Sequence, residues 1–118
     1  MLLIQIGIIF CALSVIIGAF GAHSLENIIA DKMDTFKTGV QYQIFHGLAL
    51  ILTGILSKVL EIDLNISGYL FIIGIILFSG TLYLISIYKY SFLGIITPIG
   101  GLSFVIGWFI LIFKISNH

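Results

Sequence analysis

Composition and charge place this chain outside the soluble proteins. It has 118 residues, of which 60% are hydrophobic and only 8% charged, whereas about a quarter of the residues in a soluble domain are charged. Five basic residues, all lysine, balance five acids. Without arginine the chain has no strongly basic surface for gripping nucleic acid or anionic lipid. A soluble domain and a nucleic-acid partner are therefore excluded.

Four stretches of the chain contain no Asp, Glu, Lys or Arg. They are Met1 to Leu25, Thr38 to Ser57, Leu64 to Tyr88 and Tyr90 to Phe113. Each is close to the roughly 20 residues that a helix needs to cross a bilayer. We therefore predict an all-α membrane protein, a single domain over residues 1–118 that forms a four-helix bundle. The expected spans cover residues 2–22, 39–57, 67–88 and 98–113.

The first span carries a stripe of small residues. Its members, which recur every three or four positions, are Gly7, Cys11, Ser14, Gly18 and Ala22. Such stripes let helices approach closely in lipid, so this face is expected to pack on a neighbouring helix. No Lys or Arg precedes the span, which favours a retained helix over a cleaved signal peptide. Cys11 is the only cysteine, so an internal disulfide is excluded.

The segment between the first two spans is the most charged part of the chain. Over residues 24–37 apolar side chains recur at helical spacing among acids and lysines, which predicts a short amphipathic helix in the membrane interface. Thr38 and Gln41 are three residues apart just before an apolar run. This spacing is typical of a capping box, so it predicts that the second helix starts here.

The last two spans show similar signals. Ser79 and Tyr83 share one face of the third span, while Tyr88 and Tyr90 suit the aromatic belt at the membrane surface. Thr97 followed by Pro98 predicts the cap and first turn of the fourth helix. The preceding residues, 92–96, are expected to form a bent lead-in to that helix.

His23 and His46 are the candidates for chemistry, because ionisable side chains are costly to keep in or beside a membrane span. His23 precedes Glu26 by three residues and His46 follows Tyr42 by four, so each pair shares a helix face. Four interpretations stay open. The histidines could relay protons with Tyr42 and Glu26, bind a metal together with Glu26, ligate a haem, or fix the helix register through hydrogen bonds.

Two sets of residues are therefore singled out. The polar residues expected either to function or to hold the bundle in register are His23, Glu26, Gln41, Tyr42, Gln43, His46, Ser79, Tyr83 and Thr97. The residues expected to serve helix packing or turns are Gly18, Gly21, Gly39, Gly80, Pro98, Gly100, Gly101 and Gly107. No nucleophile elbow, phosphate loop or zinc-protease motif is present, so we expect no enzyme and no resident cofactor or metal.

Four blocks of sequence resemble the YgdD and YwdK family of small bacterial inner-membrane proteins, a domain-of-unknown-function family. They are Gly18 to His23, Thr38 to His46, Leu77 to Tyr83 and Thr97 to Trp108. The resemblance spans essentially the whole chain. It implies a plasma-membrane bundle with both termini cytoplasmic, and it brings no agreed reaction, cofactor or catalytic set.

Three functions follow as hypotheses. The first is a structural or accessory role in membrane and envelope integrity, either as a homo-oligomer or within a larger membrane complex. The second is a small-solute or proton-coupled transporter or channel lined by His23, Glu26, Tyr42 and His46. The third is a membrane module that binds haem, quinone or lipid near His46.

Overall fold

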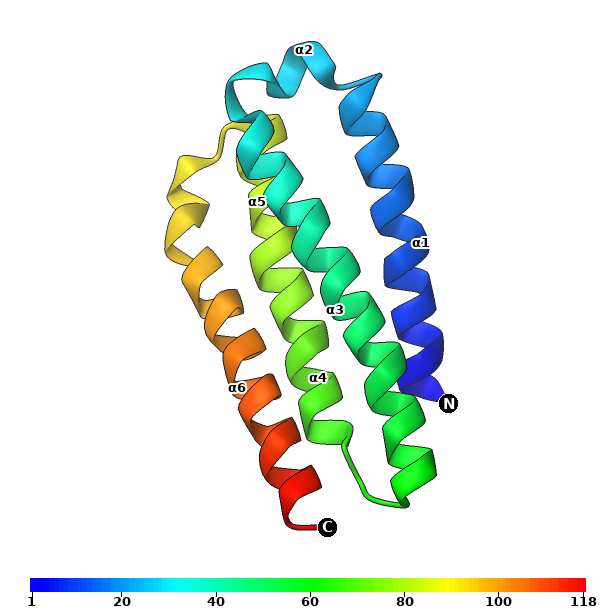
Figure 1. Cartoon of the computed structure of the whole chain (residues 1–118). Coiled ribbons are helices and arrows are strands. Elements are labelled where there is room, and N and C mark those ends of the chain that lie inside the picture. Colours follow the sequence, from blue (N-terminus) through cyan, green and yellow to red (C-terminus); the bar gives the residue numbers. More distant parts are fainter.

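Four long helical segments run side by side in alternating directions and account for nearly the whole chain (Figure 1). The computed structural model describes residues 1–118. In chain order the elements are α1 (Leu2–Ala22), α2 (Glu26–Ile29), the 3-10 turn η1 (Ala30–Lys32), α3 (Met33–Leu60), α4 (Asn65–Gly74), the π-helical segment η2 (Ile75–Ser79), α5 (Gly80–Tyr88), the 3-10 turn η3 (Ser91–Ile95) and α6 (Thr97–Ser116).

The expectation of four membrane spans is confirmed. The helical stretches Leu2–Ala22, Glu26–Leu60, Asn65–Tyr88 and Ser91–Ser116 each contain a segment long and apolar enough to cross a membrane, and the second stretch begins with the charged residues of α2 and η1, which precede α3. Helices α4, η2 and α5 follow one another without a break and make up the third of these spans. Both termini lie at the same end of the bundle, beside the connection from α3 to α4 (Figure 1).

The start of the second span differs from its expected position. Helix α3 begins at Met33, whereas the capping-box signal pointed to Thr38. The Thr38 hydroxyl instead donates to the Asp34 carbonyl, 2.8 Å away and one turn earlier, so Thr38 is an interior residue of the helix. The interfacial segment is accordingly shorter than residues 24–37 and consists of α2 and η1.

The start of the fourth span also differs in detail. Thr97 is the first residue of α6 and the N-cap position belongs to Ile96, which has no capping side chain. The Thr97 hydroxyl lies 2.6 Å from the Thr81 hydroxyl on α5 and donates to the Leu93 carbonyl of η3 at 3.3 Å, so it does not cap α6. Pro98 occupies the first turn as expected. The lead-in is the 3-10 turn η3.

Close backbone contacts set the helix order. Helix α1 packs on α3, α3 packs on α4 and α5, and α4 with η2 packs on α6. A methyl group added at Gly7 of α1 would lie 2.6 Å from the Gly47 carbonyl of α3. One added at Gly100 of α6 would lie 2.4 Å from the Phe78 nitrogen in η2. Glycine is therefore required at both helix crossings.

The resulting bundle is long and flat, with principal extents of 49 × 26 × 17 Å. Its apolar core lies where α3, α4, η2 and α6 meet and includes Leu50, Phe71, Ile75 and Phe104. Helix α1 contributes one buried side chain to this core, Leu3 in its first turn, while Ile6 and Phe10 pack against the core and are partly buried. Most of its side chains face outward, so α1 is attached to the rest of the bundle chiefly through α3.

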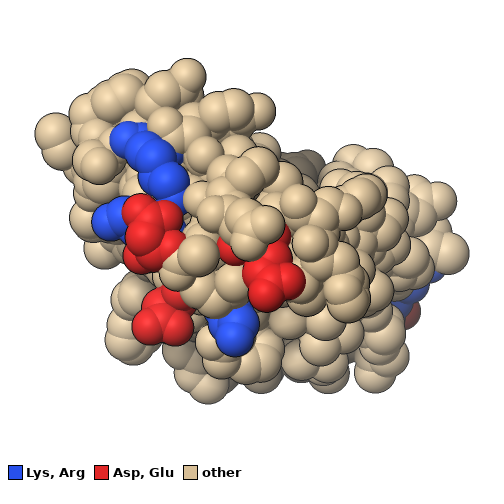
Figure 2. Space-filling model, turned by 90° about the horizontal axis from the view of Figure 1, so that it is seen from above, with Lys and Arg blue, Asp and Glu red and all other residues tan.

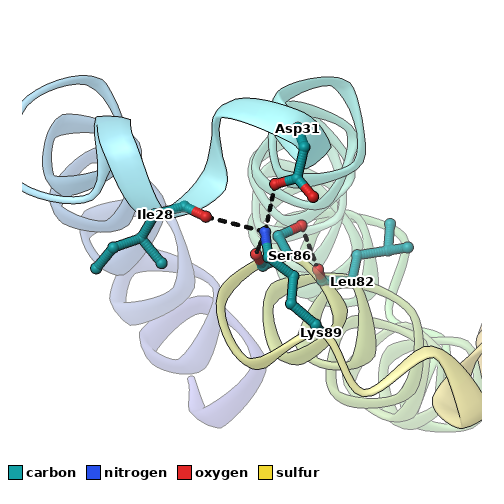
Figure 3. A network of polar contacts seen from close by, with 5 residues as sticks. All are labelled: Ile28, Asp31, Leu82, Ser86 and Lys89. Carbon is teal, nitrogen blue, oxygen red and sulfur yellow. Dashed lines mark hydrogen bonds and ion pairs between the residues drawn. The ribbon is translucent and has the colours of Figure 1, made fainter.

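Charged side chains of both signs gather over the α2 end of the bundle (Figure 2). Among them, Lys89 ends α5 in the left-handed conformation, with φ of 61°. Its ammonium donates to the Asp31 carboxylate at 2.6 Å and to the carbonyls of Ile28 and Ser86 at 2.9 and 2.8 Å (Figure 3). Lys89 therefore clamps the interfacial segment to the end of α5.

Candidate functional site

His46 of α3 lies inside the bundle with 5% of its surface exposed. Its Nδ1 is 2.9 Å from the Tyr42 carbonyl, and its Nε2 is 3.0 Å from the indole Nε1 of Trp108 on α6. Because an indole N–H can only donate, Nε2 must accept, and Nδ1 then carries the proton that is donated to Tyr42. These partners assign a neutral imidazole with a proton on Nδ1.

Aromatic rings surround the imidazole on its remaining sides. Phe104 stacks on it, with ring centroids 3.6 Å apart and ring planes 11° apart. The rings of Phe71, Trp108 and Tyr42 have their centroids 5.5, 5.8 and 6.1 Å from it. No side chain of opposite charge contacts His46. Its surroundings therefore favour the uncharged ring.

A shallow groove of about 390 Å³ opens beside this histidine. It runs between α3, η2 and α6 and is lined by Tyr42, His46, Phe78, Gly101, Phe104, Val105 and Trp108. Its walls are almost entirely apolar. An extra methyl group at Gly101 would make only ordinary contacts with Phe78, at 3.7 Å, so no packing contact requires glycine there.

A second polar centre, one turn from His46, joins three helices. The Gln43 amide donates to the Phe10 carbonyl of α1 at 2.8 Å, and its amide oxygen accepts the Tyr83 hydroxyl of α5 at 2.6 Å. The Ser79 hydroxyl donates to the Gly39 carbonyl at 2.7 Å. All these bonds cross between helices, so each holds a pair of helices in register.

The π-helical segment η2 positions several of these groups. A π turn contains one residue more than an α turn and often marks a functional site. Here it places Ser79 against α3 and turns the backbone at Phe78 toward Gly100. The Thr81 hydroxyl lies 2.7 Å from the Leu77 carbonyl and 2.6 Å from Thr97, so it fills the loosened turn and links it to α6.

The residues predicted to share a metal or proton site are not brought together. His23 and Glu26 are exposed at the α2 end, whereas His46 is buried within the bundle. No three side chains of His, Cys, Asp or Glu are grouped as metal ligands. Both ring nitrogens of His46 already have protein partners. The two-histidine arrangements considered for metal and haem therefore do not occur in this structure.

The other residues singled out from the sequence lie apart from one another in the bundle. Gln41 and Tyr42 are exposed on α3, and Gln41 borders a hollow with Gly18 and Gly21. A methyl group at Gly21 or Gly39 would meet Phe36 at 2.2 Å or Tyr83 at 2.8 Å, and one at Gly107 would meet Phe71 at 2.8 Å. At Gly18 and Gly80 the nearest atoms are 3.5 and 4.0 Å away. Those two positions have room for a methyl group.

The partners of His46 were not predicted from the sequence. Trp108 and Phe104 are four residues apart on α6 and so share the face that meets α3. The available signal was Trp108 itself, because a tryptophan within a span carries one N–H that needs an acceptor. Few polar side chains in the neighbouring spans can supply that acceptor, and His46 is one of them.

Comparisons with known proteins identify the family. The family described as Protein of unknown function (DUF423) matches residues 17–101. The UPF0382 membrane protein SH2409 of Staphylococcus haemolyticus is 45% identical over 112 residues, which cover 94% of this chain and 92% of the relative. The UPF0382 membrane protein YwdK of Bacillus subtilis is 43% identical over 112 residues, which cover 92% and 91%.

The UPF0382 membrane protein SAB0533 of Staphylococcus aureus is 43% identical, over 94% of this chain and 92% of its own length. No solved structure matches the chain. The relatives are named as membrane proteins, in agreement with the four membrane-length helices. This chain is thus a multi-pass membrane protein that belongs to the DUF423 family, the one that its four sequence blocks resemble.

Proposed function

We propose that this chain is a structural or accessory protein of the bacterial plasma membrane, that it supports membrane integrity, and that it is not an enzyme. One observation carries the proposal: both ring nitrogens of His46 are bonded within the bundle, one of them to Trp108 on another helix. The side chain best suited to proton or metal chemistry is thereby used to hold α3 and α6 together.

The remaining polar side chains also support a structural role. Gln43 bridges α1 and α5, Ser79 bonds to α3, and the Ser103 hydroxyl of α6 donates to the Leu70 carbonyl at 2.7 Å. In lipid such bonds and close glycine contacts are what bind helices together. Such contacts hold the helices at fixed positions relative to one another, as a structural role requires.

A transporter needs a path of polar groups across the membrane, and the contacts of His46 argue for a different use. Its ring faces phenyl and indole groups, and His23 and Glu26 lie outside the bundle. The proposed plasma-membrane location rests on the bacterial family and on four spans that occupy nearly the whole chain.

The test combines a deletion strain with purified protein. The strain lacking this protein is complemented with the wild type, Trp108→Phe or His46→Ala, and uptake of a membrane-impermeant dye is measured. We expect increased dye uptake in the deletion strain, with rescue that follows the folded amount of each variant. Proton flux into vesicles containing the wild type, abolished in a folded His46→Gln variant, would overturn the proposal.

A further inference from the structure

A second cavity lies at the opposite end of the bundle from α2. It has a volume of about 280 Å³ and is formed where α1 begins, α3 ends and α4 begins. Its lining residues are Met1, Leu2, Leu3, Gly54, Ser57, Lys58, Asn65 and Tyr69. Nothing in the His46 site or in the proposed function uses this cavity.

The polar side chains of this cavity are mainly hydrogen-bond donors without partners. The Lys58 ammonium forms no ion pair in the chain, whose one salt bridge joins Lys89 and Asp31. Neither the side-chain amide of Asn65 nor the Tyr69 hydroxyl forms a hydrogen bond with another group of the chain, although the Asn65 backbone N–H does. These three donors come from α3 and α4 and border one space, and because all three residues are exposed, their N–H and O–H groups are free to bind a ligand there.

No carboxylate lines the cavity. The nearest acids along the chain are Glu61 and Asp63, which lie in the exposed connection between α3 and α4. The Asp63 carboxylate already accepts the backbone N–H of Asn65 at 2.9 Å. The Lys58 ammonium and the Met1 amino group, with neutral donors and no acid beside them, are complementary to an anion with several acceptor oxygens, and phosphate esters have this character.

The other half of the cavity is apolar and leads toward the membrane. Leu2 and Leu3 belong to the first turn of α1, and Gly54 belongs to the last two turns of α3. This end of the spans is where a bilayer has its headgroups. A ligand that fills both halves therefore has a phosphate beside a hydrocarbon chain.

We propose that this cavity binds an anionic phospholipid, with its phosphate on Lys58, Asn65 and Tyr69 and its glycerol and first chain carbons against Leu2 and Leu3. The absence of arginine rules out a strongly basic patch, and this site does not need one. Its selectivity comes from the Lys58 ammonium, the Met1 amino group and two neutral donors around one phosphate. This proposal does not depend on the structural role proposed above.

The experiment uses the full chain purified in mild detergent and native mass spectrometry to count bound lipid. Phosphatidylglycerol, phosphatidylcholine and sn-glycerol 1-phosphate are each titrated in turn. The key variant is Lys58→Gln, and the matched control is Lys114→Gln, which removes a lysine from the last turn of α6, outside the cavity. Tyr69→Phe removes one hydroxyl and keeps the ring.

We expect one phosphatidylglycerol molecule to bind more tightly than phosphatidylcholine. Lys58→Gln should weaken this binding about fivefold, since one lysine near anionic lipid contributes about 1 kcal/mol. Tyr69→Phe should weaken it about threefold, as expected for loss of one neutral hydrogen bond. Lys114→Gln should leave it unchanged.

Two results would overturn the proposal. Equal weakening by Lys58→Gln and Lys114→Gln would mean that lipid responds only to the overall charge of this end. Displacement of phosphatidylglycerol by sn-glycerol 1-phosphate at similar concentrations would mean that the cavity takes a free phosphate ester and that the apolar half is not used.

Discussion

His46 of α3 and Phe104 of α6 stack with 3.6 Å between their ring centroids. Phe104 is itself 4% exposed, so the pair is buried together. Trp108, one turn further along α6, completes the contact by donating to the imidazole. The histidine thus makes both an aromatic contact and a hydrogen bond to the same partner helix, and its removal should affect both.

His46→Ala is expected to lower the free energy of unfolding by about 3 kcal/mol, because it leaves a cavity and an unpaired indole N–H. Trp108→Phe removes the hydrogen bond and keeps a ring, so it should cost about 1 kcal/mol. Unfolding in mixed micelles of mild detergent and dodecyl sulfate, followed by circular dichroism, measures both. A cost of less than 1 kcal/mol for His46→Ala would contradict the assigned contacts.

The adjacent glycines at the start of α6 provide a matched pair. In Gly100→Ala the new methyl group would lie 2.4 Å from the backbone nitrogen of Phe78, which cannot move away as a flexible side chain could. We expect a loss of about 2 kcal/mol. In Gly101→Ala the nearest atom is a side-chain carbon at 3.7 Å, so stability should be unchanged or rise by up to about 1 kcal/mol. Equal losses of stability in Gly100→Ala and Gly101→Ala, in the same unfolding assay, would mean that α6 lies further from η2 than it does in this structure.

Gln43 and Tyr83 are expected to be energetically coupled across α3 and α5. Their side chains share a 2.6 Å hydrogen bond, and a bond of this kind within a membrane contributes about 0.6 kcal/mol on average. A double-mutant cycle with Gln43→Leu and Tyr83→Phe should therefore give a coupling energy of about 0.5 to 1.5 kcal/mol. Strictly additive single effects would show that the bond does not contribute to stability.

The contact between Lys89 and Asp31 at the α2 end should weaken in acid. The hydrogen bond from the Lys89 ammonium lowers the pKa of the Asp31 carboxyl below its ordinary value. A lowered folded-state pKa means that the stabilisation is complete above the ordinary carboxyl range and is lost as the pH falls through the lowered value. Amide hydrogen exchange in residues 26–32 should therefore show less protection at pH 3 than at pH 6, after correction for the intrinsic rates.

Asp31→Asn is the variant that tests this contact, and Asp34→Asn is its control, since Asp34 has no ion pair. Asp31→Asn should show low protection at both pH values, and Asp34→Asn should behave like the wild type. If Asp31→Asn left the exchange protection of residues 26–32 unchanged, this segment would be held in place by its apolar contacts, such as those of the fully buried Ile29, and not by the contact with Lys89.

The four spans could be predicted from sequence because the bilayer imposes a length and an apolar composition on each of them. Helix ends were less predictable. The Thr38–Gln41 spacing suits a helix start, yet Met33 to Lys37 continue the same helix because Phe36 is buried against α1 and α5. Tertiary packing extended the helix beyond its local signal.

The π segment and the partner of His46 could not be predicted from one sequence. No residue in Ile75–Ser79 breaks the helical pattern, and the wide turn is explained by contacts with Gly39 and Gly100 on other helices. The acceptor for Trp108 depends likewise on which face of α6 meets α3. The spacing of residues along one helix shows which of them share a face. It does not show which other helix that face contacts.

The longest dimension of the molecule, 49 Å, is only slightly greater than the 40–45 Å or so that a bilayer spans with its headgroups. The connections at both ends therefore finish near the level of the phosphates, and hardly any of the chain reaches into the water on either side. A soluble protein would have little exposed surface to bind. Most of the exposed apolar side chains of this chain therefore face the lipid from the sides of the bundle.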